Sequence, residues 1–139
     1  MINFYYETRY NLENEERLKE WIKDVIISEE KSIGEISYIL CNDEYLLDIN
    51  QRFLEHDTYT VIFCFDNSLG IQLSGDLFIS TERVEENAKL FKVSNEEEMR
   101  RVLIHGVLHF CGYKDKTTKE EELMRKKEDE KLKMFHVER

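Results

Sequence analysis

The chain has 139 residues, the length of about one domain, and 41% of them are hydrophobic, which favours a packed core and excludes a disordered protein. The longest apolar run covers residues 61–65 and is far shorter than the ~20 residues that span a bilayer, so we expect no transmembrane helix. The net charge of −10 argues against an overall nucleic-acid-binding surface, because such surfaces are normally basic.

Short β-branched, aromatic or alternating runs predict strands, and apolar residues that recur every three or four positions predict helices. In chain order, we expect a strand over residues 2–6, a helix of about four turns after Asn14, a strand over 35–40, a helix after Asn42 through residue 53, and strands over 60–65 and 71–80. A helix after Ser80 through residue 91 and helices over 94–112 and 118–135 complete the chain. The turn-forming residues 66–70 join two of these strands in a hairpin. The predicted fold class is α+β: a small mixed sheet with a hairpin, covered by helices, in a single domain over residues 1–139.

Capping residues mark the expected starts of the helices. The predicted N-caps are Asn14, Asn42 and Ser80. Two capping boxes are expected to open the last two helices: Ser94 with Glu97, and Thr118 with Glu121. The last helix carries a charge run over residues 120–130, which predicts a solvent-facing, salt-bridged surface.

The N-terminal residues and the cysteines indicate the cellular compartment. Its first residues show no basic segment followed by an apolar one, so we expect no secretory signal. The odd number of cysteines (Cys41, Cys64 and Cys111) fits reduced thiols better than a disulfide framework. Both observations predict a soluble, cytoplasmic protein.

Charge is distributed unevenly along the chain. Residues 1–99 carry 9 Lys/Arg and 22 Asp/Glu, whereas residues 100–139 carry 11 and 8. A phosphate-facing surface would therefore draw on the C-terminal segment. The alternative, which charge alone favours, is that this segment is only a solvated helix face.

One segment has residue types and spacings typical of a metal site. His105 and His109 are four residues apart, so on a helix both imidazoles face one point, as in the zinc-binding helix of zincin proteases. Gly112 stands where a C-cap glycine would reverse the chain and return Asp115 to that point. Two imidazoles and a carboxylate leave a fourth position for water, as in catalytic zinc sites. We predict a metal site of His105, His109 and Asp115; the alternative is that the histidines are ordinary core or cap residues.

The residue after the first histidine distinguishes this segment from a protease. In zincin proteases that position holds a glutamate that acts as general base. Here it is Gly106, which has no side chain to take a proton. A small metallopeptidase is therefore disfavoured, and the sequence assigns no catalytic general base.

Residues 105–113 read HGVLHFCGY and resemble the H-G-x-L-H-x-x-G-Y signature of the YbeY family. Two upstream segments support this. Residues 50–65 resemble the family's N-x-x-aromatic segment with its later Asp, Thr and Phe, and residues 75–80 (GDLFIS) resemble its Gly-Asp-hydrophobic strand. The resemblance covers nearly the whole chain.

Members of this family are bacterial, zinc-dependent endoribonucleases that are specific for single-stranded RNA and act in rRNA maturation and ribosome quality control. The resemblance implies a hydrolase with one Zn²⁺ per chain, held by His105, His109 and Asp115, and with a metal-bound water as nucleophile. It also implies single-stranded RNA or rRNA, the ribosome or ribosomal proteins as partners, and no membrane.

The chain departs from the family pattern at three places. The family usually has a third histidine where this chain has Asp115; a carboxylate is an acceptable ligand, but it widens the choice of metal to Mn²⁺, Fe²⁺ or Ni²⁺. Leu54 replaces an arginine thought to engage phosphate, and residues 59–61 (Tyr-Thr-Val) replace the usual Pro-Thr-Asp. The candidates to substitute for the lost arginine are Arg52, His56 and Arg83.

Further side chains have both an ordinary and a functional interpretation. Tyr113 either stacks a base or packs at the helix end. Asp76 either orients a ligand imidazole or is an ordinary strand-end residue. Cys111 is a soft ligand by type but is expected to be a small buried thiol, and His136 is expected to be a solvated helix-end residue.

These observations together predict a metal-dependent endoribonuclease. The alternative is a non-catalytic ribosome-assembly or RNA-binding factor on the same fold. Leu54 and the acidic net charge favour that alternative, since both weaken the expected contact with phosphate.

Overall fold

The protein is described by a computed structural model over residues 1–54 and 61–135. Its strands form one sheet in the order β1-β2-β4-β3. They are β1 (Ile2–Tyr6), β2 (Ser32–Cys41), β3 (Ile62–Asp66) and β4 (Gln72–Ser80). β2 runs parallel to both β1 and β4, whereas β3 is antiparallel to β4. The predicted mixed sheet and hairpin are confirmed; the predicted strand start at Thr60 lies outside the described residues.

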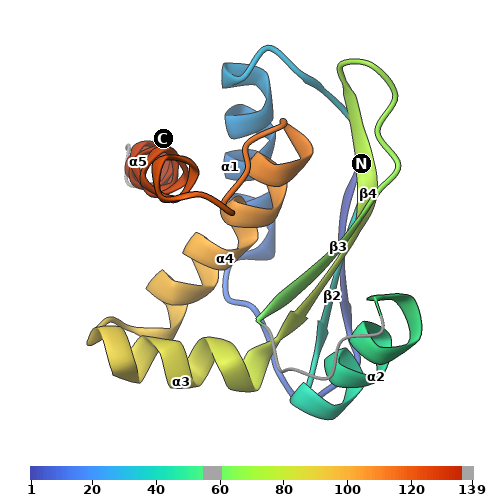
Figure 1. The fold of residues 1–139 in the computed structure, drawn as a ribbon, viewed down its shortest axis with the longest axis vertical. Coiled ribbons are helices and arrows are strands. Elements are labelled where there is room, and N and C mark those ends of the chain that lie inside the picture. Colours follow the sequence, from blue (N-terminus) through green and yellow to red (C-terminus); the bar gives the residue numbers. More distant parts are fainter. Residues whose placement is uncertain (55–60, 136–139) are drawn as a thin grey trace.

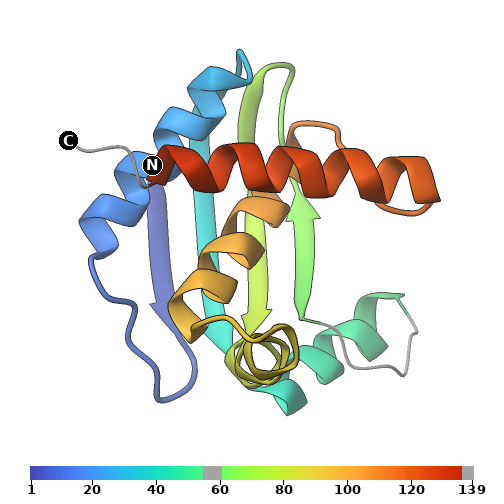
Figure 2. The same cartoon turned by 90° about the vertical axis from the view of Figure 1, so that its left-hand side faces the viewer.

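Helices lie on both faces of the sheet, and on one face they form two layers. They are α1 (Glu15–Ser28), α2 (Asp43–Leu54), α3 (Thr81–Phe91), α4 (Asn95–Phe110) and α5 (Thr118–Phe135). α1 and α4 cover one face, and α5 crosses outside them (Figures 1 and 2). α2 lies at one end of the opposite face, next to β3 and β4. The α+β class is confirmed, and no helix in the described ranges is long and apolar enough to cross a membrane.

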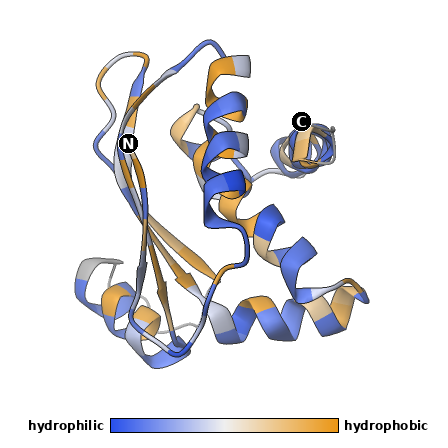
Figure 3. Cartoon of the chain, turned by 180° about the vertical axis from the view of Figure 1, so that it is seen from behind, coloured by the Kyte–Doolittle hydropathy of each residue, from blue (hydrophilic) through white to orange (hydrophobic). Residues whose placement is uncertain are grey.

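The core lies between the sheet and the α1/α4 layer, where apolar residues of both meet (Figure 3). Hydrogen bonds from two buried side chains fix how the layers lie on one another. Tyr38 on β2 donates its hydroxyl to the carbonyl of Leu103 on α4 at 2.8 Å. Trp21 on α1, which is fully buried, donates its indole N–H to the carbonyl of Lys131 on α5, also at 2.8 Å. The three layers are therefore joined by hydrogen bonds as well as by hydrophobic contact.

Gly106 lets α4 approach the sheet closely. A Cβ atom at this position would lie 2.2 Å from Cδ2 of Leu77 on β4 and 2.9 Å from Cδ1 of Ile62 on β3. A larger residue would require these two terminal methyl groups to move. The glycine that lacks a zincin-type general base thus also allows the close packing of helix on sheet.

The helix caps follow the sequence with two exceptions. Asn42 accepts from the amide of Tyr45, and Ser80 from that of Arg83, as predicted. Asn14 does occupy the N-cap of α1, but it has a left-handed backbone (φ 57°) and its side chain makes no cap hydrogen bond, so the predicted side-chain cap is wrong.

The capping box of α5 is shifted by one residue from the prediction. Thr117, not Thr118, accepts from the amide of Glu120 at 3.1 Å. Glu120 in turn accepts from the amide of Thr117 at 2.9 Å. Threonine occupies both 117 and 118, and glutamate occupies 120 to 122, so the pattern fits two registers and only the structure selects one.

The inner face of α5 is more buried than its charge predicts. Glu128 and Lys131 are 5% and 3% exposed, so the prediction of a solvent-facing surface over residues 120–130 is wrong for Glu128. Lys131 lies 2.7 Å from Glu29 at the end of α1. The same carboxylate accepts from the hydroxyl of Tyr113 at 2.6 Å. This Glu29–Tyr113–Lys131 cluster anchors α5 on α1.

Candidate metal centre

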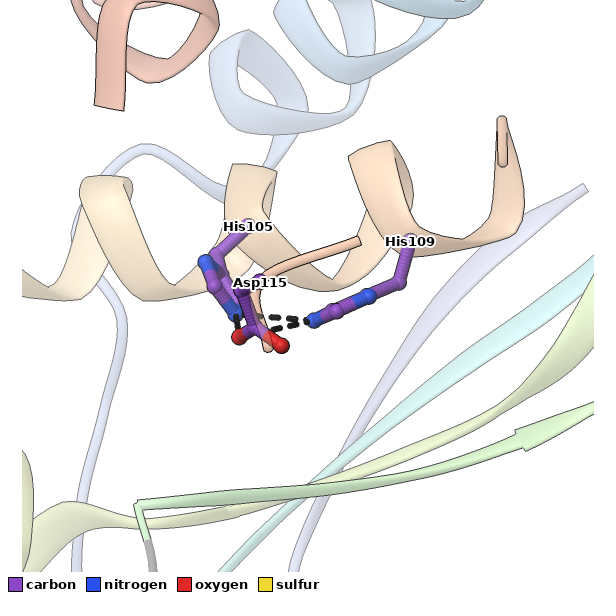
Figure 4. A group of neighbouring side chains, drawn as sticks. All are labelled: His105, His109 and Asp115. Carbon is purple, nitrogen blue, oxygen red and sulfur yellow. Dashed lines mark hydrogen bonds and ion pairs between the residues drawn. The ribbon is translucent and has the colours of Figure 1, made fainter. Parts of the chain in front are cut away.

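The last two turns of α4 present two imidazoles to one point. His105 and His109 lie one turn apart, and their Nε2 atoms are 3.0 Å from each other (Figure 4). Leu103, Ile104, Val107 and Leu108 on the same helix are buried in the core. Their packing fixes the rotation of α4, so both histidines project from its partly exposed side.

The chain reverses directly after α4 and brings back the third side chain. Gly112 has φ 106°, a left-handed conformation that favours glycine, and its amide donates to the carbonyl of His109 at 2.9 Å. The amide of Tyr113 donates to the carbonyl of Leu108 at 3.1 Å, which completes a Schellman motif. Asp115 follows and turns its carboxylate toward the histidines (Figure 4).

The three ligand atoms form a nearly regular triangle. Oδ2 of Asp115 lies 3.2 Å from Nε2 of His105 and 3.3 Å from Nε2 of His109. A tetrahedral zinc ion, with ligands at about 2.0–2.1 Å, separates neighbouring ligand atoms by about 3.3 Å. The residues that the sequence predicted as ligands therefore fit such an ion, with a fourth direction left for another group.

The other ring nitrogen of each histidine is hydrogen-bonded. Nδ1 of His109 is 3.0 Å from the carbonyl oxygen of Tyr113, which can only accept, so this nitrogen carries the proton. Nδ1 of His105 is 2.6 Å from Oε2 of Glu128 on α5. In each ring, Nε2 is left with its lone pair directed at the common point, as metal binding requires.

Glu128 is held in its charged form. Burial by itself raises the pKa of this carboxyl, but hydrogen bonds with His105 and Arg101 outweigh burial and lower the pKa below its ordinary value. Arg101 on α4 donates to its Oε1 at 2.8 Å. The side chain of Glu128 is 7% exposed, compared with 21% for His105 and 39% for Asp115. The site is thus open to solvent at the carboxylate ligand and closed behind His105.

The remaining candidates do not join the triangle. Tyr113 directs its hydroxyl to Glu29 and belongs to the cluster that anchors α5. Asp76 precedes Leu77, which faces α4, so it lies on the opposite face of the sheet and orients no imidazole. Burial raises the pKa of the Cys111 thiol to about 11, which keeps this weakly exposed sulfur protonated.

Two of the candidates to replace the lost arginine are paired with carboxylates of α2. Arg52 lies 3.1 Å from Asp48 on the same helix, and Arg83 lies 3.1 Å from Asp43. His56 and His136 lie outside the described residues.

A sequence model described as endoribonuclease YbeY matches residues 3–136. The chain belongs to the endoribonuclease YbeY family. It is 60% identical over 138 residues to the endoribonuclease YbeY of Flavobacterium johnsoniae, with 99% of each chain covered. It is 50% identical over 115 residues to that of Bacteroides fragilis, with 83% of each covered.

A solved structure has the same fold. The solution structure of TM1509 from Thermotoga maritima superposes with a TM-score of 0.68 at 25% sequence identity, over 97% of this chain and 89% of that one. The resemblance to the YbeY family that the motif at residues 105–113 indicated is therefore confirmed, together with the fold class.

Sequence reasoning missed Glu128. It lies within the charge run over residues 120–130, for which the density of charge predicts a solvated surface. Yet Met124, Glu128 and Leu132 are spaced by four, and all three are buried. An acidic residue between two apolar ones on the same helix face was the available signal.

Proposed function

We propose that this chain is a metal-dependent endoribonuclease that cleaves single-stranded RNA. The observation that carries the proposal is the convergence of two imidazole nitrogens and a carboxylate oxygen, all within 4.8 Å of one another. It occurs in a chain 60% identical to a protein named as an endoribonuclease. The proposed ligands are His105, His109 and Asp115, and the proposed ion is Zn²⁺, one per chain.

A bound divalent ion would lower the pKa of a water molecule and polarise a phosphoryl oxygen, which are the two effects that phosphodiester hydrolysis needs near neutral pH. The residues of the chain orient the ligand atoms. The carbonyl of Tyr113 and the carboxylate of Glu128 keep both Nε2 lone pairs on the site. Because Asp115 adds one negative charge to two neutral rings, the loaded site keeps a charge of about +1, which attracts a phosphodiester.

Charge supports a nucleic-acid substrate, and chain flexibility favours a single strand. The site lies on α4 and in the loop before α5, within the C-terminal segment that carries 11 Lys/Arg against 8 Asp/Glu over residues 100–139. A single strand bends and brings one phosphodiester to the ligand triangle, whereas an A-form duplex holds its phosphates in a fixed arrangement.

Cleavage of a short unstructured RNA by metal-loaded protein tests this function. We expect the wild-type chain to cut the single strand and to leave the matching duplex intact. His109→Ala removes a ligand and should lower the cleavage rate by more than about 100-fold, beyond the effect of losing a ligand's outer partner. Cys111→Ala, two residues further on and outside the triangle, is the matched control and should retain the activity.

Metal analysis separates the candidate functions. We expect about one zinc per chain in the wild-type and Cys111→Ala proteins and none in His109→Ala. Zinc binding without RNA cleavage would favour the non-catalytic RNA-binding factor. Since two histidines and a carboxylate also suit Mn²⁺, Fe²⁺ and Ni²⁺, the same analysis identifies the metal that the purified protein retains.

We further propose that the enzyme acts in the cytoplasm, on rRNA, in maturation and quality control of the ribosome. Cells depleted of the protein should accumulate unprocessed rRNA precursors, which RNA blots measure. Re-expression of the wild-type chain, but not of His109→Ala, should remove them. Normal precursor levels after depletion would contradict this role while leaving the nuclease activity in place.

A further inference from the structure

We propose that Glu128 is a positioning residue of the metal centre, which holds His105 in the tautomer that binds metal and makes α5 part of the site. The inference rests on the proposed function. It is carried by the 2.6 Å contact between Oε2 of Glu128 and Nδ1 of His105, across 23 residues of sequence. Glu128 does not touch the ligand triangle itself.

The two oxygens of Glu128 have separate partners. Oε2 accepts from His105, and Oε1 accepts from Arg101 at 2.8 Å. Arg101 is also paired with a second carboxylate, since it donates to Asp129 at 2.8 Å. The guanidinium is thus paired even without Glu128, whereas no contact described for Nδ1 of His105 within residues 1–54 and 61–135 offers it another acceptor. The carboxylate of Glu128 is therefore needed as a partner by His105 more than by Arg101.

The burial of Glu128 determines which of the two residues carries the proton. The side chain of Glu128 is 7% exposed, and a buried carboxylate is stable only where charged or N–H donors satisfy it. A charged carboxylate accepts and cannot donate, so the proton between the two residues belongs to Nδ1 of His105. Nε2 is left unprotonated and faces His109 and Asp115.

The two histidines are oriented by different means. A backbone carbonyl of the adjacent turn holds His109, and a side chain from another helix holds His105. A cavity of about 150 Å³ lies between the site and α5 and is lined by His105, Asp115, Glu121, Met124, Arg125 and Glu128. Undocking of α5 would thus remove the acceptor of one ligand and expose its ring to water.

Zinc affinity in the absence of RNA is the first test, measured by competition with a chromophoric chelator at pH 7.5. Glu128→Gln should bind zinc about 10- to 100-fold more weakly, as is usual when the outer partner of a ligand is lost. Glu128→Asp keeps the charge on a shorter side chain and should fall between the two. Equal affinities of wild type and Glu128→Gln would overturn the inference.

The matched control is Glu29→Gln. Glu29 is a half-buried carboxylate that also joins α5 to the rest of the fold, through Lys131, but it contacts no ligand side chain. This variant should keep its zinc affinity within about threefold of the wild type, as expected for an independent site. An equal loss in Glu29→Gln and Glu128→Gln would mean that Glu128 acts only by anchoring α5, and would also overturn the inference.

The tautomer of His105 gives a second readout that a purely structural role would not move. Long-range proton–nitrogen NMR spectra of the metal-free protein at pH 8 should place the proton of His105 on Nδ1 in the wild type and Glu29→Gln proteins. In Glu128→Gln the amide can donate as well as accept, so a mixture of both tautomers is expected. A proton on Nε2 in the wild type would contradict the inference.

These measurements separate the failure of the two proposals. If the wild-type chain binds zinc but cuts no RNA, the proposed function fails and the role of Glu128 stands. If it binds zinc and cuts RNA but is indifferent to Glu128→Gln, only the role of Glu128 fails. If it binds no divalent metal, both fail together.

Discussion

The two sides of the metal centre are built in opposite ways. On one side, His109, the turn at Gly112 and the carbonyl of Tyr113 lie within a few residues of one another, and backbone hydrogen bonds fix their geometry. On the other side, His105 depends on Glu128, which α5 brings in from 23 residues away. The first side is complete once α4 and its turn form; the second needs the tertiary fold.

The two sides of the metal centre therefore depend on different parts of the fold: the His109 side on a local turn, and the His105 side on the docking of α5. A local turn persists while its helix does, since a Schellman motif needs only contacts close in sequence. The docking of α5 depends on buried ion pairs and on apolar contacts with α1 and α4. Conditions that loosen α5 should therefore affect His105 before His109.

The largest expected effect on stability comes from Glu29→Gln, which weakens the anchoring of α5 on α1 but leaves Glu128 and its contact with His105 in place. Burial by itself raises the pKa of Glu29, but hydrogen bonds from Lys131 and Tyr113 outweigh it and lower the pKa below the usual 4.5. Removing this half-buried, ion-paired charge should cost about 2 kcal/mol of unfolding free energy at pH 7, measured by urea denaturation.

The pH dependence of that loss has a definite sign. Because the folded pKa of Glu29 is lowered, its charge stabilises the fold fully above pH 4.5, and the contribution disappears as the pH falls through the lowered value. The difference in urea midpoint between wild type and Glu29→Gln should therefore shrink below pH 4.5. A difference that stays constant down to pH 3 would contradict this account of Glu29.

Gly112→Ala disturbs the turn on the His109 side of the metal centre, with a smaller loss of unfolding free energy. The alanine must adopt φ 106°, which should cost about 1–2 kcal/mol of unfolding free energy. Gly70→Ala is the matched control, because Gly70 has φ 57°, lies in the β3–β4 turn and, like Gly112, has open space around it. Both variants should melt at lower temperature, but only Gly112→Ala should also weaken zinc binding. Equal zinc affinities would show that the turn does not set the position of Asp115.

Thr117→Ala changes the start of α5, which follows the loop that carries Asp115. It has the smallest expected effect on unfolding free energy. It removes the hydroxyl that caps α5 through the amide of Glu120, a change that costs about 1 kcal/mol. Thr118→Ala, one residue further on, leaves that hydrogen bond in place. The two variants, compared by thermal denaturation, decide between the two registers of the capping box. A greater loss in Thr118→Ala would restore the register that the sequence suggested.

The local parts of the molecule were predictable from sequence. The histidine pair, the glycine at the helix end and Asp115 lie within eleven residues, and one helical turn followed by a C-terminal turn relates their positions. The hairpin and the caps at Asn42 and Ser80 are also short-range features with distinct residue signals. Each of these predictions agrees with the structure.

What is harder to predict depends on which helix face is buried. α5 is rich in charge, and only the spacing of Met124 and Leu132 marks its inner face, whose contacts with α1 and α4 are set by the tertiary fold. The position of Glu128 between them is visible in the sequence, but its partner His105 is not. The choice between Thr117 and Thr118 failed for a related reason, since both registers satisfy the local pattern and tertiary packing of α5 decides.

The close approach of α4 to the sheet couples the residue that follows the first histidine to the interior beneath it. A side chain on residue 106 would start 2.2 Å from Cδ2 of Leu77 and 2.9 Å from Cδ1 of Ile62, so a substitution there makes both methyl groups move. A change of Gly106 that is meant to alter the chemistry of the exposed helix face therefore also alters the core.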